Sequence, residues 1–342
     1  MKALLLPANA NLTVSAIMRR VIYALIPAIV VHIVMFGWGL LWNLLIATVT
    51  AVIAEALFLK IRDRPVLLSL LDYSAVVTAI LLAFALPPYA PWWLVCLGSL
   101  IAIVVAKHIY GGLGQNPFNP AMVGYAMMLI SFPLQMSRWP KPLLLQPVKL
   151  NLSQSYHFVF DNSQANIPLD FISTASPLDT WRIQRGITGD LATLFHQPLF
   201  GHLGYAGGEW VALAIAAGGV WLLWQRIITW QIPISLLVSV VVTATLFYLF
   251  EPGKQFFPFS HLILGATMLG AFFIATDPVT APASPRAQML YGACIGALIV
   301  LIRVWGGFPD GVAFSVLIMN MFAPLLDKYL KPRVFGTGRL ES

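Results

Sequence analysis

Ten long apolar runs, each close to the length that crosses a bilayer, constrain this chain more than any other feature of its sequence. One helical span needs about 20 apolar residues, and only 10% of the 342 residues are charged, against about 25% in a soluble domain. We expect spans near residues 21–37, 40–59, 66–86, 92–109, 118–136, 208–225, 231–250, 261–276, 287–304 and 310–326. The sequence therefore predicts an all-α polytopic membrane protein of about ten transmembrane helices.

Basic residues are distributed unequally between the two sides that ten spans create. Both termini fall on one side, together with 13 of the 20 Lys and Arg residues. Five of the other seven lie in the long segment 137–207, whose charges count little for orientation. Short basic loops stay in the cytoplasm, so we expect cytoplasmic termini and an outward-facing 137–207 segment. This distribution also explains the net charge of +7 without nucleic acid as a partner.

The polar segment 137–207 divides the chain into halves of five expected spans each, residues 1–136 and 208–342. Because five is odd, two related halves would be inverted repeats. Tyr110-Gly111-Gly112 and Trp305-Gly306-Gly307 precede the last span of their halves, which supports a repeat. The third expected span of each half is interrupted by polar or glycine residues, a feature that points to a site between repeats.

Within the long segment, residues 170–179 form the polar stretch DFISTASPLD. Ser176, Pro177 and Asp179 fit the N-cap, N1 and N3 positions of a helix, a structural role that needs no further chemistry. A second hypothesis is compatible with the first. A helix N-terminus also favours a bound phosphate, so a phosphoester on the capping oxygen would be stabilised by the same geometry.

This stretch resembles the acceptor motif for covalent flavin, Asp-x-x-Ser/Thr-Gly-Ala-Thr/Ser, of membrane electron-transfer subunits. The matching residues are Asp170, Ser173, Ala175 and Ser176, whereas Thr174 stands where the motif usually has Gly. The resemblance implies that Ser176 holds FMN through a phosphoester bond made by a separate flavin transferase. The usual acceptor is Thr, so the Ser is a second departure from the motif.

A second informative stretch, YGGLGQNPFNPAMVGY, spans residues 110–125. Its glycines and Asn-Pro pairs cannot form a helix that faces lipid, because unsatisfied backbone groups there cost several kcal/mol each. One hypothesis is a tight loop followed by a helix that Asn119 caps. The other is a pocket for a non-covalent flavin or an ion, which the backbone approaches closely. The residues of that pocket would be Gly111, Gly112, Gly114, Asn116 and Asn119.

Three segments, 111–122, 266–282 and 306–320, resemble the hallmark segments of the RnfD family, the D subunits of the bacterial Rnf complex, within the wider family that includes the B subunit of the sodium-pumping quinone reductase. The similarity runs from about Ile22 to Val334. It implies a urea-transporter-like fold of two inverted five-helix repeats in a bacterial inner membrane, with covalent FMN on the periplasmic loop and riboflavin, bound non-covalently, in the membrane. It also implies that the chain is not catalytic alone.

By the same resemblance, the chain would act in a redox-driven ion translocase of the ferredoxin/NAD oxidoreductase type that moves Na⁺ or H⁺. Its partners would be the A, B, C, E and G subunits, the flavin transferase and the lipid bilayer. The fold would equally suit a permease for a small neutral solute, or a scaffold without a cofactor. A visible flavin band would separate an electron carrier from these alternatives.

Other residues give weaker signals. Cys96 and Cys294 lie in apolar runs without metal-ligand spacing, so we expect neither a disulfide framework nor a metal site. The histidines in or near the expected spans, His32, His108 and His261, are each expected to have a structural role rather than to bind a ligand or transfer a proton. Trp139 fits an interfacial belt, and Trp181 could pack against a flavin or against the core of its own segment.

Overall fold

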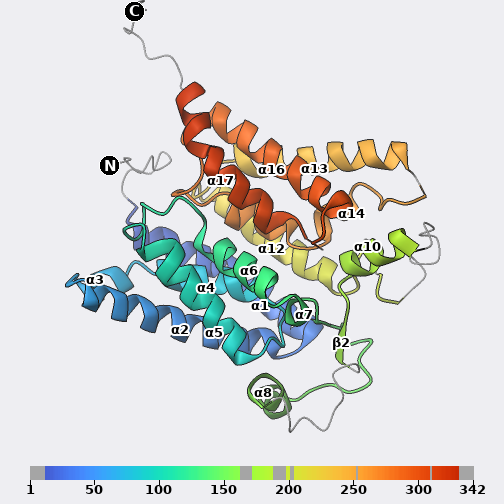
Figure 1. Ribbon diagram of the computed structural model, residues 1–342, viewed down its shortest axis with the longest axis horizontal. Helices are drawn as coiled ribbons and strands as arrows, with labels where there is room; N and C mark the ends of the chain where they lie inside the picture. Colours follow the sequence, from blue (N-terminus) through green and yellow to red (C-terminus); the bar gives the residue numbers. More distant parts are fainter. Residues whose placement is uncertain are drawn as a thin grey trace, which may run out of the picture.

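The computed structural model describes residues 12–161, 172–187, 198–200, 204–251, 253–308 and 310–330, and it is an all-α protein. In Figure 1 the helices before residue 140, coloured blue to green, form one layer, and those after residue 207, yellow to red, form a second. The helices of the first layer are α1 (Val14–Phe36), α2 (Gly39–Ile61), α3 (Val66–Leu70), α4 (Ser74–Ala85), α5 (Trp92–Leu100), η1 (Ile101–His108), α6 (Pro120–Ser131) and α7 (Pro133–Met136). Those of the second are α12 (Gly208–Trp224), α13 (Gln231–Phe250), α14 (Ser260–Ile263), α15 (Thr267–Leu269), η2 (Gly270–Ile274), α16 (Pro285–Trp305) and α17 (Val312–Tyr329).

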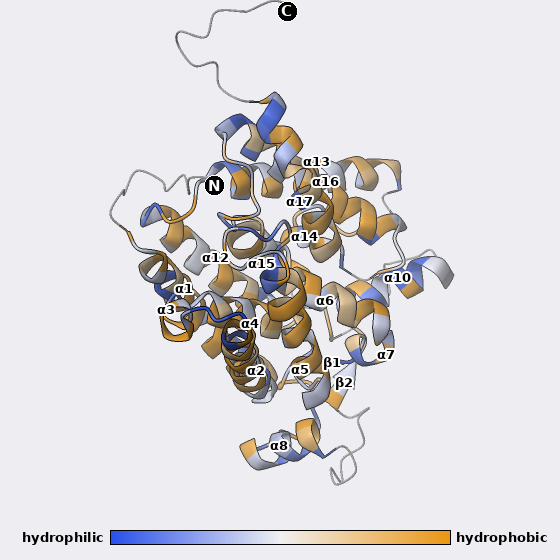
Figure 2. Ribbon diagram, turned by 60° about the vertical axis from the view of Figure 1, so that its left-hand side comes forward, coloured by the Kyte–Doolittle hydropathy of each residue, from blue (hydrophilic) through white to orange (hydrophobic). Residues whose placement is uncertain are grey.

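Five of the described helices, α1, α2, α13, α16 and α17, are long and apolar enough to cross a bilayer unbroken. Their exposed faces carry large aliphatic side chains, among them Val34, Ile53 and Val242. Figure 2 shows α2 predominantly hydrophobic, whereas α8 and α10 of the intervening segment carry hydrophilic residues. A hydrophobic outer surface on long helices is what lipid contact requires. The prediction of an all-α polytopic membrane protein is confirmed.

Three predicted spans are broken in the structure. The expected 66–86 helix is divided between α3 and α4, because Tyr73 adopts a left-handed conformation at φ 62° beside Asp72. The 261–276 helix is interrupted around Gly265, at φ 64°. Near the end of the 118–136 helix, Phe132 leaves the helical conformation directly before Pro133. That break has a local cause, since the residue before a proline disfavours the helical region.

Glycines bring the helices of the second half close together and join them to the first. Gly292 and Gly296 of α16 lie one turn apart against the backbone of α13, where a Cβ atom would overlap carbonyl oxygens. Gly218 of α12 lies equally close to the backbone of α1 at Ala24. Small residues at such positions allow helices to pack closely in a membrane. The α1–α12 contact therefore forms part of the junction between the halves.

The segment between the halves contacts both of them. It contains β1 (Trp139–Pro140), β2 (Ser173–Thr174), α8 (Leu152–Phe160) and α10 (Pro177–Ile187), and the two short strands pair antiparallel. Helix α8 lies under the first layer and α10 beside the second (Figure 1). Arg185 of α10 donates to Val304 O at 2.8 Å and pairs with Glu251 at 3.1 Å. This segment is therefore positioned to close the space between the halves from one side.

One local arrangement occurs in both halves. A hydroxyl residue follows each break in the third span, Ser74 in the first half and Thr267 in the second, and both are buried. Each hydroxyl accepts a hydrogen bond from a buried cation of the next span, Ser74 from Lys107 and Thr267 from Arg303. Related halves are expected to repeat such an arrangement, and the division at 1–136 and 208–342 stays a prediction.

Candidate functional site

A cavity of about 150 Å³ lies where the two halves meet the intervening segment. Helices α1, α4 and α6 line it from the first half, and α12, α15, η2 and α17 from the second. Residues of β1 and the start of α10 line its remaining side. Its wall is mostly apolar, with a small number of polar groups, which is the usual composition of a cofactor site. Helices α4 and α15, which follow the breaks in the third span of each half, both contribute to its wall.

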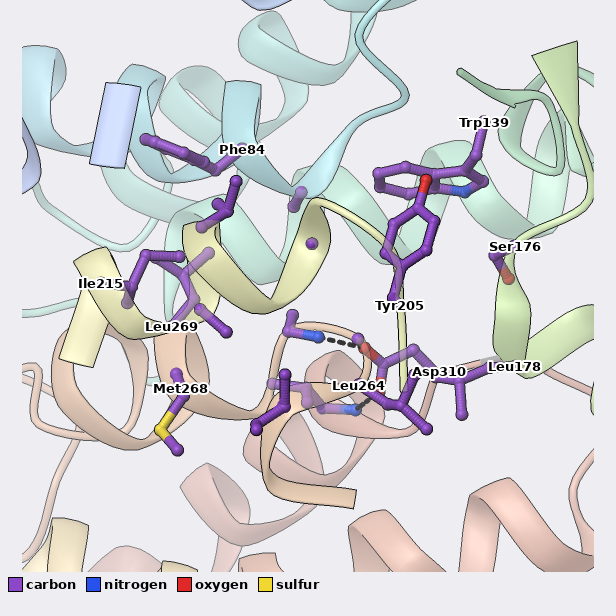
Figure 3. Close-up of a pocket in the computed structure, with 18 of the residues that line it drawn as sticks. Phe84, Trp139, Ser176, Leu178, Tyr205, Ile215, Leu264, Met268, Leu269 and Asp310 are labelled. Atoms are coloured by element: carbon purple, nitrogen blue, oxygen red, sulfur yellow. Dashed lines mark hydrogen bonds between the residues drawn. The ribbon is translucent and has the colours of Figure 1, made fainter. Parts of the chain in front are cut away.

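Trp139 and Tyr205 form an aromatic wall at the side of the intervening segment (Figure 3). The Tyr205 hydroxyl donates to Pro140 O at 3.0 Å, and its ring lies 5.4 Å from the ring of Phe36. Burial raises the pKa of Tyr205, so its hydroxyl stays a neutral donor. The wall is therefore held in place by β1 and α1 together.

Ser176 lines the cavity at the first turn of α10. Its hydroxyl oxygen accepts from the Asp179 backbone N–H at 3.1 Å and donates to Asp179 Oδ2 at 3.2 Å. The predicted N-cap is confirmed. Asp179 is 5% exposed and also lies 3.2 Å from Arg182. Burial raises the pKa of Asp179, against the opposing effects of the Arg182 charge and the Ser176 hydrogen bond.

The break around Gly265, in the third span of the second half, forms another wall of the cavity. Ala266 N–H donates to Asp310 Oδ2 at 2.7 Å, and the Arg303 guanidinium lies 3.0 Å from Asp310 Oδ1. Arg303 also donates to the carbonyl oxygens of His261 and Leu264, which the break leaves without helical partners. Gly265 passes so close to this ion pair that a Cβ atom would overlap Asp310. The pair thus holds the break open and presents one carboxylate to the cavity (Figure 3).

The deep part of the cavity is apolar except for His32 of α1. Phe84, Ile215, Met268 and Leu269 surround this region. The His32 ring lies 5.0 Å from the ring of Phe36, and its Nδ1 atom has no hydrogen-bond partner among the described residues. A buried nitrogen without a partner costs free energy unless a ligand or water satisfies it.

The predicted flavin-attachment residues are brought together only in part. Ser173 lies in β2, where it pairs with Pro140 of β1, and Ala175 directly follows β2. Of the described motif residues, Ser176 alone lines the cavity. Asp170 falls outside the described residues. Trp181 does not line the cavity, because its ring packs 5.1 Å from Phe256 and its Nε1 donates to the Lys254 carbonyl oxygen.

The predicted second pocket lies apart from this cavity, since none of Gly111, Gly112, Gly114, Asn116 and Asn119 lines it. The three glycines have φ values of 120°, 101° and 88°, which explains their residue type by backbone conformation. Asn119 caps α6 by accepting from Met122 N–H, as one of the two hypotheses stated.

Asn119 also joins the halves. Its N–H donates to Asn320 Oδ1 of α17 at 3.1 Å, and Asn320 Nδ2 donates to the Tyr291 hydroxyl of α16 at 2.7 Å.

Sequence reasoning did not identify the cavity residues Trp139, Tyr205 and Asp310 as neighbours of Ser176. Trp139 carried a signal only for a membrane interface, and no spacing in the sequence relates the other two to Ser176.

The fold and the cavity together define a class: a polytopic membrane protein whose buried site is enclosed by two helical halves and the segment between them. Sequence comparison identifies the family. The model of the NQR2, RnfD, RnfE family matches residues 8–336, so the chain belongs to this family.

Relatives of similar length are found in enteric bacteria. The chain is 47% identical over 331 residues to the D subunit of the ion-translocating oxidoreductase complex of Shigella dysenteriae, with 94% of each chain covered. It is also 47% identical to the protein of the same name from Escherichia coli and 46% identical to that from Escherichia fergusonii, over the same shares.

Proposed function

We propose that this chain is the membrane subunit of an ion-translocating oxidoreductase complex, and that it carries FMN covalently on Ser176 with the flavin ring in the interface cavity. The observation that carries the proposal is the position of Ser176, whose side chain lines an apolar, aromatic-walled cavity. Family membership and relatives named as complex subunits support the electron-transport role.

The residues around Ser176 fit a phosphoester. Ser176 caps α10, whose N-terminus favours negative charge. Asp179 N–H, which now donates to the Ser176 oxygen, is placed to donate to a phosphate oxygen instead. The Asp179 carboxylate opposes a second negative charge, but burial raises its pKa and Arg182 lies beside it.

The cavity also fits part of a planar ring. A cavity of about 150 Å³ takes up benzene, and this one has the same volume. An isoalloxazine is larger, so its binding requires side chains at the wall beside Ser176 to shift. The flavin supplies the ability to accept and release electrons. The chain supplies an anchor at Ser176, aromatic walls that exclude water, and a carboxylate at Asp310 that can accept a hydrogen bond.

The partners, the membrane location, the second flavin and the transported ion that we propose are taken from the family resemblance. The neighbouring A, B, C, E and G subunits would pass electrons to and from this chain, in a bacterial inner membrane with both termini in the cytoplasm. A separate flavin transferase would load FMN. Riboflavin would bind non-covalently near Gly111 to Asn119, and the complex would use ferredoxin and NAD while moving Na⁺ or H⁺.

Substitution of Ser176 tests the flavin proposal. Ser176→Ala should lose covalent flavin because only a side-chain oxygen can form the phosphoester, whereas Ser176→Thr should retain it. The measurement is in-gel fluorescence of the denatured chain after coexpression with a flavin transferase. Ser153→Ala is the control, since Ser153 is an exposed residue of α8 that lies outside the attachment motif and does not line the cavity.

A fluorescent band in the Ser176→Ala chain would show that the attachment site lies elsewhere. A colourless wild-type chain that conducts a small solute in vesicles would instead support the permease. If Ser176 served only as a helix cap, the Ala variant would lose roughly 0.5–2 kcal/mol of local stability and its flavin content would stay unchanged.

A further inference from the structure

A connected row of five polar side chains crosses the interior of the first half, apart from the interface cavity. Asp72 accepts hydrogen bonds from the Ser74 backbone N–H and hydroxyl, and the Ser74 hydroxyl accepts from Lys107 Nζ at 2.7 Å. Lys107 Nζ also donates to Glu55 Oε1 at 2.7 Å. His108 Nε2 lies 3.3 Å from the same Glu55 oxygen. The row therefore connects α2, η1 and the break before α4.

Four of these side chains are buried, with exposed fractions of 1% for Glu55, 2% for Lys107 and 4% for both Ser74 and His108. Asp72 is half-buried and forms the more accessible end of the row. Ionisable groups inside a membrane are costly and usually serve a function. Lys107 and His108 also end a π-helical stretch, an irregularity that often occurs at functional sites.

Two buried atoms in this row have no hydrogen-bond partner among the described residues, Glu55 Oε2 and His108 Nε2. His108 Nε2 is close to Glu55 Oε1, but the geometry is not that of a hydrogen bond. An unprotonated Nε2 and a carboxylate oxygen are both acceptors. A proton on Nε2, together with a small rotation of the imidazole toward Glu55, would turn this unfavourable pair into a charge-assisted hydrogen bond.

The row lacks one positive charge, and the position of Lys107 beside Glu55 favours a proton over a metal ion there. Glu55 and Asp72 carry two negative charges, Lys107 carries one positive charge, and an unprotonated His108 carries none, so the row has one excess negative charge. One proton on His108 removes it. Lys107 already occupies the position beside Glu55 that a metal ion would need. The described residues also contain no group of three His, Cys, Asp or Glu side chains arranged to hold a metal.

The helices packed against η1 add no further charge to the row. On α2, Arg62 lies over the Phe58 ring at 4.8 Å, and that ring lies 5.0 Å from the His108 ring. Cys96 of α5 accepts a hydrogen bond from Thr50, and Tyr125 of α6 lines the interface cavity. On the loop before α3, Arg64 donates to Gly111 O, and Lys60 at the end of α2 is exposed.

We propose that Glu55 and His108 form a proton-binding site, and that Lys107, Ser74 and Asp72 connect it to the membrane face next to residues 109–115. This inference extends the proposed function by naming the ion that the first half handles. Lys107 passes one N–H proton to Glu55 Oε1 and takes another from the Ser74 hydroxyl, which water at that face reprotonates by way of Asp72. The O–H bond at Glu55 then breaks as an N–H bond forms at His108 Nε2, without any transfer of electrons.

The test follows the protonation of His108 in the full chain, labelled with ¹⁵N-histidine and reconstituted into liposomes. The imidazole signal that disappears in His108→Gln should change from neutral to protonated between about pH 9 and pH 5. Glu55→Gln should reduce the protonated signal of His108 at about pH 5, because it removes the carboxylate that stabilises the imidazolium. Glu55→Asp should restore most of that signal. His157→Gln, on exposed α8, is the matched control and should leave the His108 titration unchanged.

A His108 side chain that stays neutral throughout this range in the wild-type chain would overturn the proposal. An unchanged protonated signal of His108 in Glu55→Gln would also overturn it, since Glu55 would then not share a proton with His108. In the purified complex, His108→Gln should abolish electron-driven proton uptake while covalent flavin content stays at the wild-type level. The two proposals fail separately, because Ser176→Ala tests the flavin and should leave the His108 titration intact.

Discussion

At the scale of single residues, the structure contains two kinds of buried charge. Arg303 and Asp310 neutralise each other and satisfy the carbonyl oxygens of a broken helix. Asp179 is a less balanced case, because it is 5% exposed while its partner Arg182 is half-buried. Burial outweighs the favourable contacts and raises the pKa of Asp179. Its charged form therefore reduces the stability of the segment that positions Ser176.

The pH dependence of stability should show this effect. A carboxyl group whose pKa is raised by folding costs free energy at every pH above that pKa, at about 1.4 kcal/mol per pKa unit. The cost declines as pH falls below the raised pKa and is gone near the ordinary pKa of an aspartate, about 3.9. We expect α10 to resist proteolysis better at about pH 4 than at about pH 7.5, and Asp179→Asn to remove most of this difference.

The control for this measurement is Asp161→Asn, at a half-buried position after α8. A protease that is equally active at both pH values is required. If Asp179→Asn made α10 easier to cleave at both pH values, the contacts with Ser176 and Arg182 would outweigh burial, and the expected sign would be wrong.

At the scale of elements, the irregular positions of the helices are where the polar side chains gather. The break between α3 and α4 lies beside Lys107, and the break at Gly265 lies beside Arg303. In each case a backbone that leaves the helix exposes groups that need partners. The 110–119 loop differs, since Gly112 and Gly114 are required by positive φ rather than by a close neighbour. The Cβ of residue 112 would lie 3.8 Å from His108, and that of residue 114 would have no atom within 4 Å.

Residue 112 lies close to His108 and residue 114 has open space around it, and this contrast allows a test of the second flavin pocket. Gly112→Val and Gly114→Val should both lose roughly 1–2 kcal/mol of stability, because both force a branched residue into a left-handed conformation. If the loop also binds riboflavin next to His108, Gly112→Val should lose non-covalent flavin and Gly114→Val should keep it. The measurement is the flavin released from equal amounts of inserted chain. Equal riboflavin content in both variants would remove the support for a pocket at Gly112.

At the scale of the whole molecule, the two helical halves and the segment between them enclose one cavity. Neither half closes it alone, since Phe84 comes from the first, Ile215 from the second and Ser176 from the segment between. A site enclosed in this way depends on the relative placement of the halves. Gly218 against α1 and Asn119 against Asn320 maintain that placement.

The orientation of the chain in the membrane is also a property of the whole molecule, and protease accessibility tests it. The distribution of Lys and Arg predicts that a protease added to intact spheroplasts cuts within residues 137–207 and leaves the tail 333–342 protected. Disrupted spheroplasts are the control, in which the tail should be cleaved. Cleavage of the tail from outside intact cells would contradict a ten-span chain with both termini in the cytoplasm.

The sequence by itself determined the apolar spans and the helix starts at Ser176 and Asn119, because these depend on residues within a few positions of one another. It could not predict that Ser176 would face Trp139, Tyr205 and Asp310 across one cavity. Nor could it pair Lys107 with Glu55, 52 residues away. Only the tertiary structure decided these contacts, because they depend on how closely helices from distant parts of the chain pack, and no local pattern records that distance.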